Sequence, residues 1–458
     1  MVVEALTRDT MPSGEGDLSI EGHGIEPIPA AARYGSVWRL FTVWFTPNLV
    51  PAAFALGALC AILGLGFFTG LLAILVGNVI GGGIVAILST IGPKVGLGQI
   101  PLSRLAFGKS IVVPGLINWV STIAWDAINA FFGAYAIQVL TGNVVPFWLG
   151  LLIVIVCQAA LSVVGYEAIH TFEKYAAIGL AILFAVVTIA LLPKANFSFS
   201  GSAESLGTFV LMTTIVGSFN LGWALYASDY SRYLPASTPS IKVAGYSFLG
   251  IAISAVWIEL LGLAVFGAVT NGSADPVHQI DALLGGGLIS AVAMIAIFFG
   301  TVAVNAMNDY SGSLSLLAAG IKVYRPVSAL IVGVLSFIAT LWLYQANFNT
   351  AFENYLLFIT YWIGPWSAIV LVDWQLRRHS ATGADHVSNF SLLPSGWNAL
   401  IALAVGFIVS IPFMDASVFV GPIATALGGA DIAYVIGFVV AGAVYWGLER
   451  RSSTAVPA

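Results

Sequence analysis

The chain has 458 residues, of which 59% are hydrophobic and 8% are charged, with 16 Lys and Arg against 21 Asp and Glu. Soluble domains are about 25% charged and about 45–50% apolar, so this composition excludes a soluble globular protein and predicts an all-α integral membrane protein. The two cysteines, Cys60 and Cys157, lie inside apolar segments, which argues against a disulfide framework or a cysteine metal site.

The first forty residues are polar and lack the basic-then-apolar pattern of a cleaved signal peptide, so 1–40 is predicted to be a cytoplasmic tail. Twelve apolar segments long enough to cross a bilayer, which takes about 20 residues, follow it. The predicted spans are 41–66, 68–90, 111–139, 146–164, 175–193, 208–227, 246–270, 285–320, 328–345, 354–373, 396–413 and 433–448. Two of them, 111–139 and 285–320, exceed one straight crossing and are expected to include a tilt or an extra-membrane turn.

The basic residues give the orientation. With twelve crossings and the N-terminus inside, fifteen of the sixteen Lys and Arg fall on the cytoplasmic side and only Lys194 falls outside. Short cytoplasmic loops carry an excess of Lys and Arg. The count predicts that both termini, including a tail at 449–458, are cytoplasmic, and that the protein resides in the cell inner or plasma membrane.

Two predicted spans have sequences that interrupt a helix. Pro47 and Pro51 lie in the first span, and Gly217, Asn220 and Gly222 lie in the sixth. Ordinary proline kinks and glycine packing explain each span taken alone. Interrupted helices at corresponding positions of two halves, however, indicate an inverted-repeat transporter with a substrate site near the middle of the membrane.

This correspondence predicts how the twelve helices are organised. Each interrupted span would be the first of five, so the chain would contain two repeats of five helices followed by two peripheral helices. The predicted units are 41–193 for the first repeat, 208–373 for the second repeat and 396–448 for the peripheral helices.

Aromatic and amide side chains gather on the interrupted spans and their neighbours. Trp125 and Asn129 are four residues apart and therefore share one helix face. A flat aromatic next to an amide suits a flat heterocycle, because the ring stacks and the amide reads the edge. Trp223 adjoins Gly222 in the sixth span, and Asn308 belongs to the eighth. Each tryptophan alone is equally typical of packing or of a membrane interface. Together these five residues are the predicted substrate site.

Polar groups within spans also suggest how transport is coupled. Asp126 and Glu259 are the only carboxylates that we place well inside spans. Asp126, three residues before Asn129, is predicted either to carry a proton or to be fixed at a broken helix end. Glu259 is predicted to be a structural partner of a neighbouring helix or to face a water-filled crevice. Asn305 and Thr301 are further oxygen-bearing candidates for coupling.

The remaining polar residues indicate no enzyme and no resident cofactor. The five histidines show no metal-ligand spacing, no phosphate-binding loop occurs, and no basic patch suggests a nucleic-acid partner. No catalytic residue and no confident metal ligand is therefore predicted. Four charged residues at the cytoplasmic ends of spans six and ten are predicted to be anchors: Asp229, Arg232, Asp373 and Arg377.

A pair of glycines bears on the oligomeric state. Gly77 and Gly81 form a GxxxG pattern, which is typical either of close packing within the monomer or of dimerisation. We expect packing within the monomer, so that a monomer in the lipid bilayer suffices.

Several strings, in their order and spacing, resemble the nucleobase-cation-symport family 1, and within it the purine-cytosine permease branch, from about residue 33 to 449. They are Gly92-Pro93-Lys94, Ser103-Arg104, Phe107-Gly108, Gly165-Tyr166-Glu167-Ala168-Ile169-His170, Glu173-Lys174-Tyr175, Asp229-Tyr230-Ser231-Arg232-Tyr233, Gly364-Pro365, Asp373-Trp374 and Gly429-Ala430-Asp431-Ile432.

The resemblance implies a LeuT-like fold of five plus five inverted helices, alternating access, and symport driven by H⁺ or Na⁺. It also implies that four residues hold the substrate: Trp125, Asn129, Trp223 and Asn308. The predicted function is import of a nucleobase such as cytosine or a purine. The alternatives are another small heterocycle, such as a hydantoin, allantoin or a vitamin, and a passive channel.

One departure from the family favours the proton. Sodium-coupled relatives place hydroxyl side chains on helix eight, where this chain has Val302 and Ala303. A hard cation needs several oxygen ligands. Thr301, Asn305 and the backbone carbonyls from Val50 to Ala53 are the oxygens that could still serve Na⁺.

Overall fold

A computed structural model of the protein describes residues 25–164, 166–266, 275–323, 325–377 and 387–454. Apart from one hairpin of two-residue strands, β1 (Asp415–Ala416) and β2 (Phe419–Val420), its regular structure is helical within these ranges. Parts of four predicted segments lie outside the described residues: 1–24 of the N-terminal tail, Gly165 of one family string, 267–270 of the seventh span and 455–458 of the C-terminal tail.

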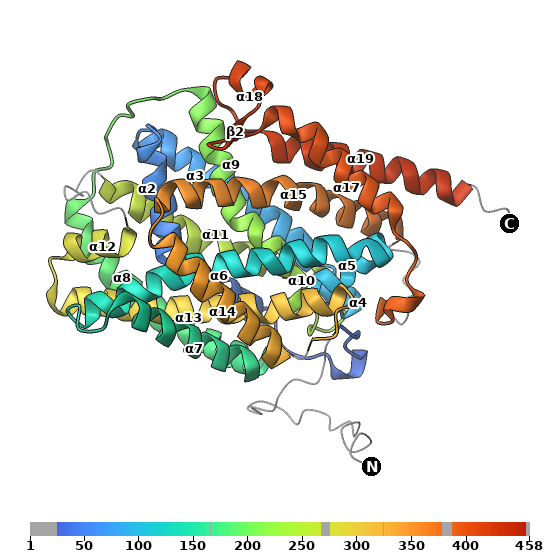
Figure 1. Ribbon diagram of the computed structural model, residues 1–458, viewed down its shortest axis with the longest axis horizontal. Helices are drawn as coiled ribbons and strands as arrows, with labels where there is room; N and C mark the ends of the chain where they lie inside the picture. The colour runs from blue at the N-terminus through green and yellow to red at the C-terminus, as the bar shows by residue number, and fades with distance from the viewer. Residues whose placement is uncertain (1–24, 165, 267–274, 324, 378–386, 455–458) are drawn as a thin grey trace, which may run out of the picture.

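The helices fall in the predicted order (Figure 1). Their bounds are α1 (Trp38–Phe45), η3 (Thr46–Asn48), α2 (Pro51–Ile62), α3 (Phe67–Ser89), α4 (Gly92–Val95), α5 (Gln99–Phe107), η4 (Gly108–Ile111), α6 (Val112–Leu140), α7 (Phe147–Val164), α8 (Tyr166–Leu191), η5 (Leu192–Lys194), α9 (Leu206–Leu221), η6 (Gly222–Tyr226), α10 (Ala227–Ser231), α11 (Ser240–Val265), α12 (Pro276–Leu284), α13 (Gly287–Ala318), α14 (Arg325–Leu343), α15 (Phe348–Arg377), α17 (Trp397–Ser410), η9 (Ile411–Phe413), α18 (Pro422–Ala426) and α19 (Ala433–Thr454). The 3-10 helices η2 (Ala30–Ala32) and η8 (Phe390–Leu392) lie outside the predicted spans.

The helices form a multi-pass membrane protein. Seven in the described part of the chain are long and apolar enough to cross a membrane, α1–η3 with α2 makes an eighth if the bent pair is one span, and three shorter helices are also apolar. Large apolar side chains such as Phe68 and Ile189 stand exposed on the outside of the bundle, at 66% and 71%. A soluble monomer rarely exposes such a surface, whereas lipid tails cover it.

The first predicted span is broken, as its prolines indicate. Thr46–Asn48 form a 3-10 turn, Val50 is extended, and α2 begins at Pro51 with a bend of 61°. Proline has no amide hydrogen and cannot continue the preceding helix, but it suits the first helical position. The side chains of Thr46 and Asn48 donate back to the carbonyls of Thr42 and Trp44, at 3.0 and 2.9 Å, so they satisfy carbonyls that the break would expose.

The sixth predicted span is interrupted in a different way. Gly217 and Asn220 are helical within α9, so the expectation of a break at these two residues is wrong. The change comes at Gly222, where the chain tightens into the 3-10 helix η6 and continues as α10 without a sharp bend. Gly217 lies instead where α9 packs closely on α3, and its carbonyl oxygen is the atom that a Cβ at Gly81 would overlap.

Several predicted boundaries differ from the observed ones. α8 begins nine residues before 175 and α11 begins six before 246, while α19 continues through 449–454 of the predicted C-terminal tail. Hydropathy locates apolar residues, and polar helical turns extend beyond them. α6 and α13 are continuous helices of 29 and 32 residues. Because 32 residues rise about 48 Å, α13 must tilt or extend beyond the hydrocarbon.

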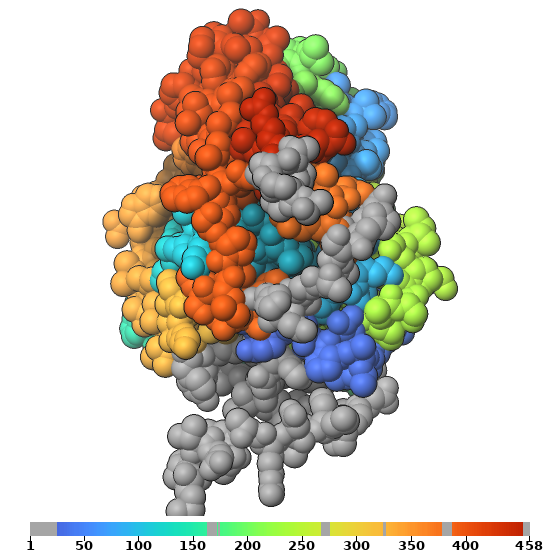
Figure 2. Space-filling model, turned by 90° about the vertical axis from the view of Figure 1, so that its right-hand side faces the viewer, coloured from blue at the N-terminus to red at the C-terminus, as the bar shows by residue number. Residues whose placement is uncertain are grey.

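The bundle is held together by extensive contacts between its long helices. α13 packs along α6, α7 and α8, while α3 lies against α9 and α11 lies against α1 and α2. α15 packs on α9 and η6 on one side and on α17 and α19 on the other. α17 and α19 therefore cover one edge of the molecule, which is the orange and red group at the top of Figure 2.

Glycines set the close approach of α3 and α9. A Cβ at Gly81 would overlap the carbonyl oxygen of Gly217, and one at Gly77 would lie 2.7 Å from Val216 Cβ. The GxxxG pair thus packs within the monomer.

We expect Gly81→Ala to reduce the free energy of unfolding by about 1–3 kcal/mol, because added atoms in a packed interface force the backbones apart. Gly83→Ala, in the same helix, is the matched control. A Cβ there meets no atom within 4 Å, so this variant should stay within about 0.5 kcal/mol of wild type. Thermal unfolding in detergent measures both, and equal melting temperatures would contradict the packing assignment.

Candidate functional site

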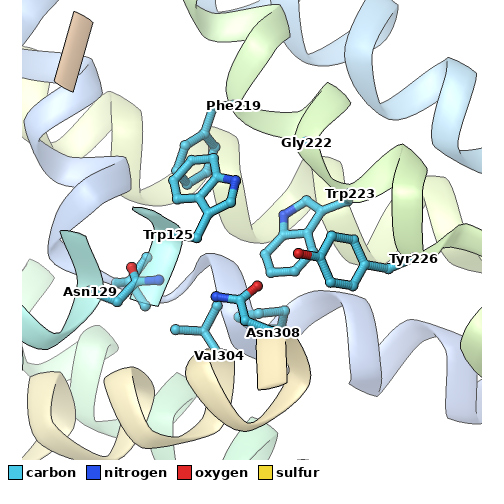
Figure 3. Close-up of a pocket in the computed structure, with 10 residues that line it drawn as sticks. Trp125, Asn129, Phe219, Gly222, Trp223, Tyr226, Val304 and Asn308 are labelled. Carbon is cyan, nitrogen blue, oxygen red and sulfur yellow. The ribbon is translucent and has the colours of Figure 1, made fainter. Parts of the chain in front are cut away.

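One cavity lies where the break of the first span meets α6, α9, η6 and α13 (Figure 3). All five predicted substrate-site residues line it. The full lining is Pro47, Val50, Trp125, Asn129, Phe219, Gly222, Trp223, Tyr226, Val304 and Asn308. The sequence reasoning did not select Phe219, Tyr226 or Val304, which lie beside or one turn from residues that it did select.

Trp125 forms one wall and is held by two aromatic side chains. Its ring meets Phe219 at a centroid distance of 5.8 Å and Tyr355 at 5.1 Å, both edge to face. The Tyr355 hydroxyl donates to the Ser121 carbonyl at 2.9 Å and so links α15 to α6. Edge-to-face contacts of this kind hold a ring in place. Gly222 leaves space beside the ring, since a Cβ there would be in van der Waals contact with the Trp125 indole, at 3.4 Å.

Trp223 forms the opposite wall, and the broken first span holds it. Its indole Nε1 donates to Asn48 Oδ1 at 3.2 Å, and its ring meets Trp44 and Tyr226 edge to face at 5.8 and 5.5 Å. Asn48 lies in η3, so the 3-10 turn that ends α1 also positions this tryptophan. The first span and the sixth span are thereby connected at the cavity.

The two amides supply the polar part of the lining. Asn129 Nδ2 donates to Asn305 Oδ1 at 3.1 Å, and no residue in the described ranges donates a hydrogen bond to the Asn129 side-chain oxygen. Asn308 is 1% exposed, and its Nδ2 has no hydrogen-bond partner within the described residues. The Tyr226 hydroxyl is buried and unpartnered in the same part of the chain. Buried polar atoms are nearly always paired, so the site offers hydrogen-bonding groups that no protein atom uses.

The cavity is closed around these groups. Its free volume is about 10 Å³, roughly the space that one water molecule needs. A heterocyclic ring is larger, so its binding requires the two indoles to move apart.

The coupling candidates form a hydrogen-bonded seam between α6, α7 and α13. Asn305 Nδ2 donates to Gln158 Oε1 at 2.7 Å and to the Asp126 carbonyl at 3.2 Å. Thr301 donates to the Asn129 carbonyl at 3.3 Å. Asn305 and Thr301 therefore face α6 and α7. No group of three or more His, Cys, Asp or Glu that could hold a metal ion occurs in the described ranges.

A buried carboxylate was missed by the sequence reasoning. The expectation that only Asp126 and Glu259 lie well inside spans is wrong, because Asp309 in α13 is 1% exposed and interacts with Asp126. Asp309 follows Asn308 directly and lies far from the end of its span, so its position in the sequence contained the signal.

Glu259 and the charged anchors have structural partners. Glu259 accepts from Asn78 Nδ2 at 2.6 Å, and Asn78 accepts from Asn220 at 2.5 Å, so the carboxylate joins α11 to α3 and α9. Of the two roles predicted for Glu259, the structural partner is observed.

The four charged anchors predicted at the cytoplasmic ends of the spans are also paired. Asp229 accepts from the Gln99 backbone amide and from Ser311 Oγ, and Arg232 donates to Tyr310 Oη. Asp373 forms an ion pair with Arg377 at 2.6 Å and accepts from the Tyr445 hydroxyl.

Comparison with known sequences identifies related permeases. The sequence model of one family, described as permease for cytosine/purines, uracil, thiamine, allantoin, matches residues 27–437. The putative purine-cytosine permease YxlA of Bacillus subtilis is 30% identical over 94% of this chain and 96% of its own. The purine-cytosine permease fcyB of Emericella nidulans is also 30% identical, over 94% and 88%.

Comparison with solved structures identifies the fold. The chain is similar to Mhp1, described as a nucleobase-cation-symport-1 family transporter in a closed conformation with bromovinylhydantoin bound. The TM-score is 0.77 over 96% of this chain and 97% of that chain, at 17% identity. At 17% identity, the similarity shows the fold of this chain but does not identify its substrate.

We expect Asn305→Ala to lower the free energy of unfolding by at least about 2 kcal/mol, because it leaves two buried polar atoms, Asn129 Nδ2 and Gln158 Oε1, without the partner that Asn305 provides. Asn354→Ala is the control. Asn354 also makes several hydrogen bonds, to Thr350 and Ser417, but they lie at the exposed end of α15. Its loss should cost less than about 1 kcal/mol. Thermal unfolding in detergent compares the two, and an unchanged melting temperature for Asn305→Ala would show that the seam contributes little.

Proposed function

The chain belongs to the family of permeases for cytosine/purines, uracil, thiamine and allantoin, and we propose that it imports a nucleobase, such as cytosine or a purine, as a secondary active symporter. The membership confirms the resemblance found in the sequence and identifies the protein as a permease and not an enzyme. The observation that carries the substrate assignment is the cavity with an indole on either side and two amides with unused hydrogen-bonding atoms.

The cavity chemistry favours a flat ring with polar edges. The substrate would stack between Trp125 and Trp223, and stacking of a base on an aromatic side chain is worth about 1–3 kcal/mol. Asn129 Oδ1 would accept from a ring or amino N–H, and Asn308 Nδ2 would donate to a carbonyl or ring nitrogen. Nucleobases carry donors and acceptors side by side on one edge, which this pair of amides complements.

A different heterocycle is the second candidate. A vitamin B6 transporter of Saccharomyces cerevisiae is 22% identical to this chain, and the family description includes thiamine and allantoin. The relatives at 30% identity are purine-cytosine permeases, which favours the nucleobase. Hydantoins, allantoin and vitamins therefore serve as competitors in the uptake assay. Saturable accumulation against a gradient separates any of these substrates from a passive channel.

The helix contacts support two inverted repeats of five helices. If the first repeat runs from α1–α2 to α8 and the second from α9–α10 to α15, exchange of the repeats turns several of the main observed contacts into other observed contacts. α3 on α9 becomes α11 on α1–α2, α14 on α6 becomes α7 on α13, and α8 on α1 becomes α15 on α9. Twelve crossings, with α17 and α19 peripheral, follow from this arrangement.

Such an arrangement provides alternating access. The broken first span and η6 occupy equivalent positions in the two repeats, and both touch the cavity. Movement of one group of helices relative to the other would open the closed cavity to one side of the membrane and then to the other. With the N-terminus and C-terminus cytoplasmic, as the basic residues predict, the substrate enters from outside. A monomer contains the whole cavity and suffices.

Coupling to H⁺ is preferred to coupling to Na⁺. Helix α13 carries Val302 and Ala303 where sodium-coupled relatives are expected to have hydroxyls, and Thr301 and Asn305 are engaged with α6 and α7. The buried carboxylate of Asp126, in contrast, lies next to the Asn308 amide of the cavity and accepts a hydrogen bond from Gln158.

Trp125→Ala should weaken uptake about tenfold or more, because it removes a stacking interaction of about 1–3 kcal/mol. Trp342→Ala is the control, since Trp342 is 65% exposed on α14 and faces away from the cavity. Uptake of radiolabelled cytosine, adenine and hypoxanthine by cells expressing equal amounts of each variant provides the measurement. Wild-type uptake by Trp125→Ala would remove the site assignment.

Uptake should follow an inward proton gradient and ignore Na⁺. Proteoliposomes with a pH gradient, a sodium gradient or neither give the test, and a protonophore should abolish accumulation in the first condition only. Strict dependence on Na⁺ would overturn the preference for protons while leaving the nucleobase assignment intact. Thermal stabilisation of the purified protein by the same bases, with and without Na⁺, reports binding independently of transport.

A further inference from the structure

Two fully buried carboxyl groups face each other behind the substrate cavity. Asp126 belongs to α6 and Asp309 to α13, and they are 0% and 1% exposed. They interact directly, close enough to share a hydrogen bond when one of them carries a proton. Neither residue is part of the cavity lining.

Most oxygens of the two carboxyl groups lack a hydrogen bond of ordinary geometry in the described part of the chain. Asp126 Oδ2 accepts from Gln158 Nε2 at 3.1 Å, but Asp126 Oδ1 and both oxygens of Asp309 accept no hydrogen bond of ordinary geometry in the described part of the chain. Two ionised carboxylates cannot satisfy each other, because each only accepts. One added proton converts the contact into an O–H···O⁻ hydrogen bond, which is among the stronger kinds.

No cation compensates the pair within the described residues. Gln158 and Ser162 face it from α7, Asn308 from α13, Tyr226 from η6 and Tyr355 from α15. Asp229 on α10 lies near Tyr226. None of these groups is Lys, Arg or His. Two uncompensated charges in a dry interior are very costly, so the pair favours holding a proton.

The pair is connected to both amides of the cavity. Asn308 precedes Asp309, and its carboxamide lies against Asp126 while lining the cavity on its other side. Asn129 reaches the pair through Asn305, which donates both to the Asp126 carbonyl and to Gln158. A change of charge at the pair therefore acts on the donors and acceptors that would read the substrate edge.

We propose that Asp126 and Asp309 together form the binding site of the coupling proton. One proton from the outside water adds to a carboxylate oxygen of the pair, and the resulting shared hydrogen bond fixes the amides for substrate binding. When the cavity opens to the cytoplasm, substrate leaves, the O–H bond breaks, and the proton passes to water, which restores the two carboxylates. The inference rests on the proposed proton symport.

Glu259 is the competing site. It is also fully buried, and its Oε1 has no hydrogen-bond partner in the described part of the chain, but its hydrogen bonds lead to Asn78 and Asn220 and not to the amides of the cavity. Glu259→Gln is therefore the matched control for Asp309→Asn, since each exchanges one buried carboxyl for an amide of similar size.

The test compares accumulation with exchange in proteoliposomes, using radiolabelled cytosine and hypoxanthine. Asp309→Asn and Asp126→Asn should lose accumulation driven by a proton gradient, because the new amide can donate to the remaining carboxylate as the protonated carboxyl did, so the pair no longer needs to bind and release a proton in each cycle. Both should retain exchange of external label for internal unlabelled base, which requires no net proton movement. Glu259→Gln should retain both activities. A residue with only a structural role would reduce exchange and accumulation together.

The outcomes separate the two proposals. If wild-type protein accumulates base without responding to the proton gradient, the proposed proton symport fails and this inference fails with it. If wild type is proton-driven and Asp309→Asn and Asp126→Asn remain so, or if only Glu259→Gln loses coupling, the inference alone is wrong.

A binding measurement covers variants that fold poorly in membranes. Base binding to purified wild-type protein should weaken as pH rises, by up to about tenfold per pH unit, because one bound proton is linked to binding. Asp309→Asn and Asp126→Asn should bind with an affinity that varies less than about threefold over the same range. An affinity of wild-type protein independent of pH would contradict the proposal.

Discussion

Lipid supplies no hydrogen bonds, so polar groups inside the bundle must find partners in other helices, and the contact of α6 with α13 is where several of them do. Asn118 bonds Ser315 at 2.7 Å, Asn129 bonds Asn305, and Thr301 bonds the Asn129 carbonyl. Small residues allow this approach; a Cβ at Gly312 would lie 2.8 Å from the Thr122 hydroxyl. The two helices form a fixed wall, and the amides at its edge are held by a network that a single exposed loop could not provide.

The segments that alternating access would move lie opposite that wall. The break before Pro51 leaves Asn48 able to hold the Trp223 indole, while η6 presents Trp223 and Tyr226 from the sixth span. Each interrupted segment therefore depends on the other for its orientation. A displacement of the first span relative to α9–η6 changes the position of Trp223 with respect to Trp125, which the α6 wall keeps in place. The same few contacts would therefore affect both the binding of substrate and the opening of the cavity.

Some features of the fold and of the candidate site could be predicted from the sequence and others could not, and each case has a physical reason. Helical spacing places Trp125 with Asn129 whatever the tertiary structure, and hydropathy finds the spans, so both survive in the fold. The same spacing cannot say which neighbour a helix faces, and Asp309 was overlooked because its partner Asp126 is remote in sequence. Glycine marks both breaks and packing, so Gly217 and Gly222 looked alike; only the approach of α3 distinguishes them. Hydropathy also stops at polar turns, which is why α8 begins before its predicted span.

The closed cavity is an unfavourable resting state for the groups around it. Asn308 Nδ2, Tyr226 Oη, Asp126 Oδ1 and both Asp309 oxygens make no hydrogen bond of ordinary geometry among the described residues. A buried polar atom left unpaired costs about 1–3 kcal/mol, and more when it is charged. A heterocycle would satisfy the first two, and one proton would join an oxygen of Asp126 to an oxygen of Asp309, so each ligand would remove part of the cost that the empty site carries. Because Asn308 adjoins both sets, satisfying one would orient it for the other, and the proposed coupling of base to proton would follow from unmet hydrogen bonds.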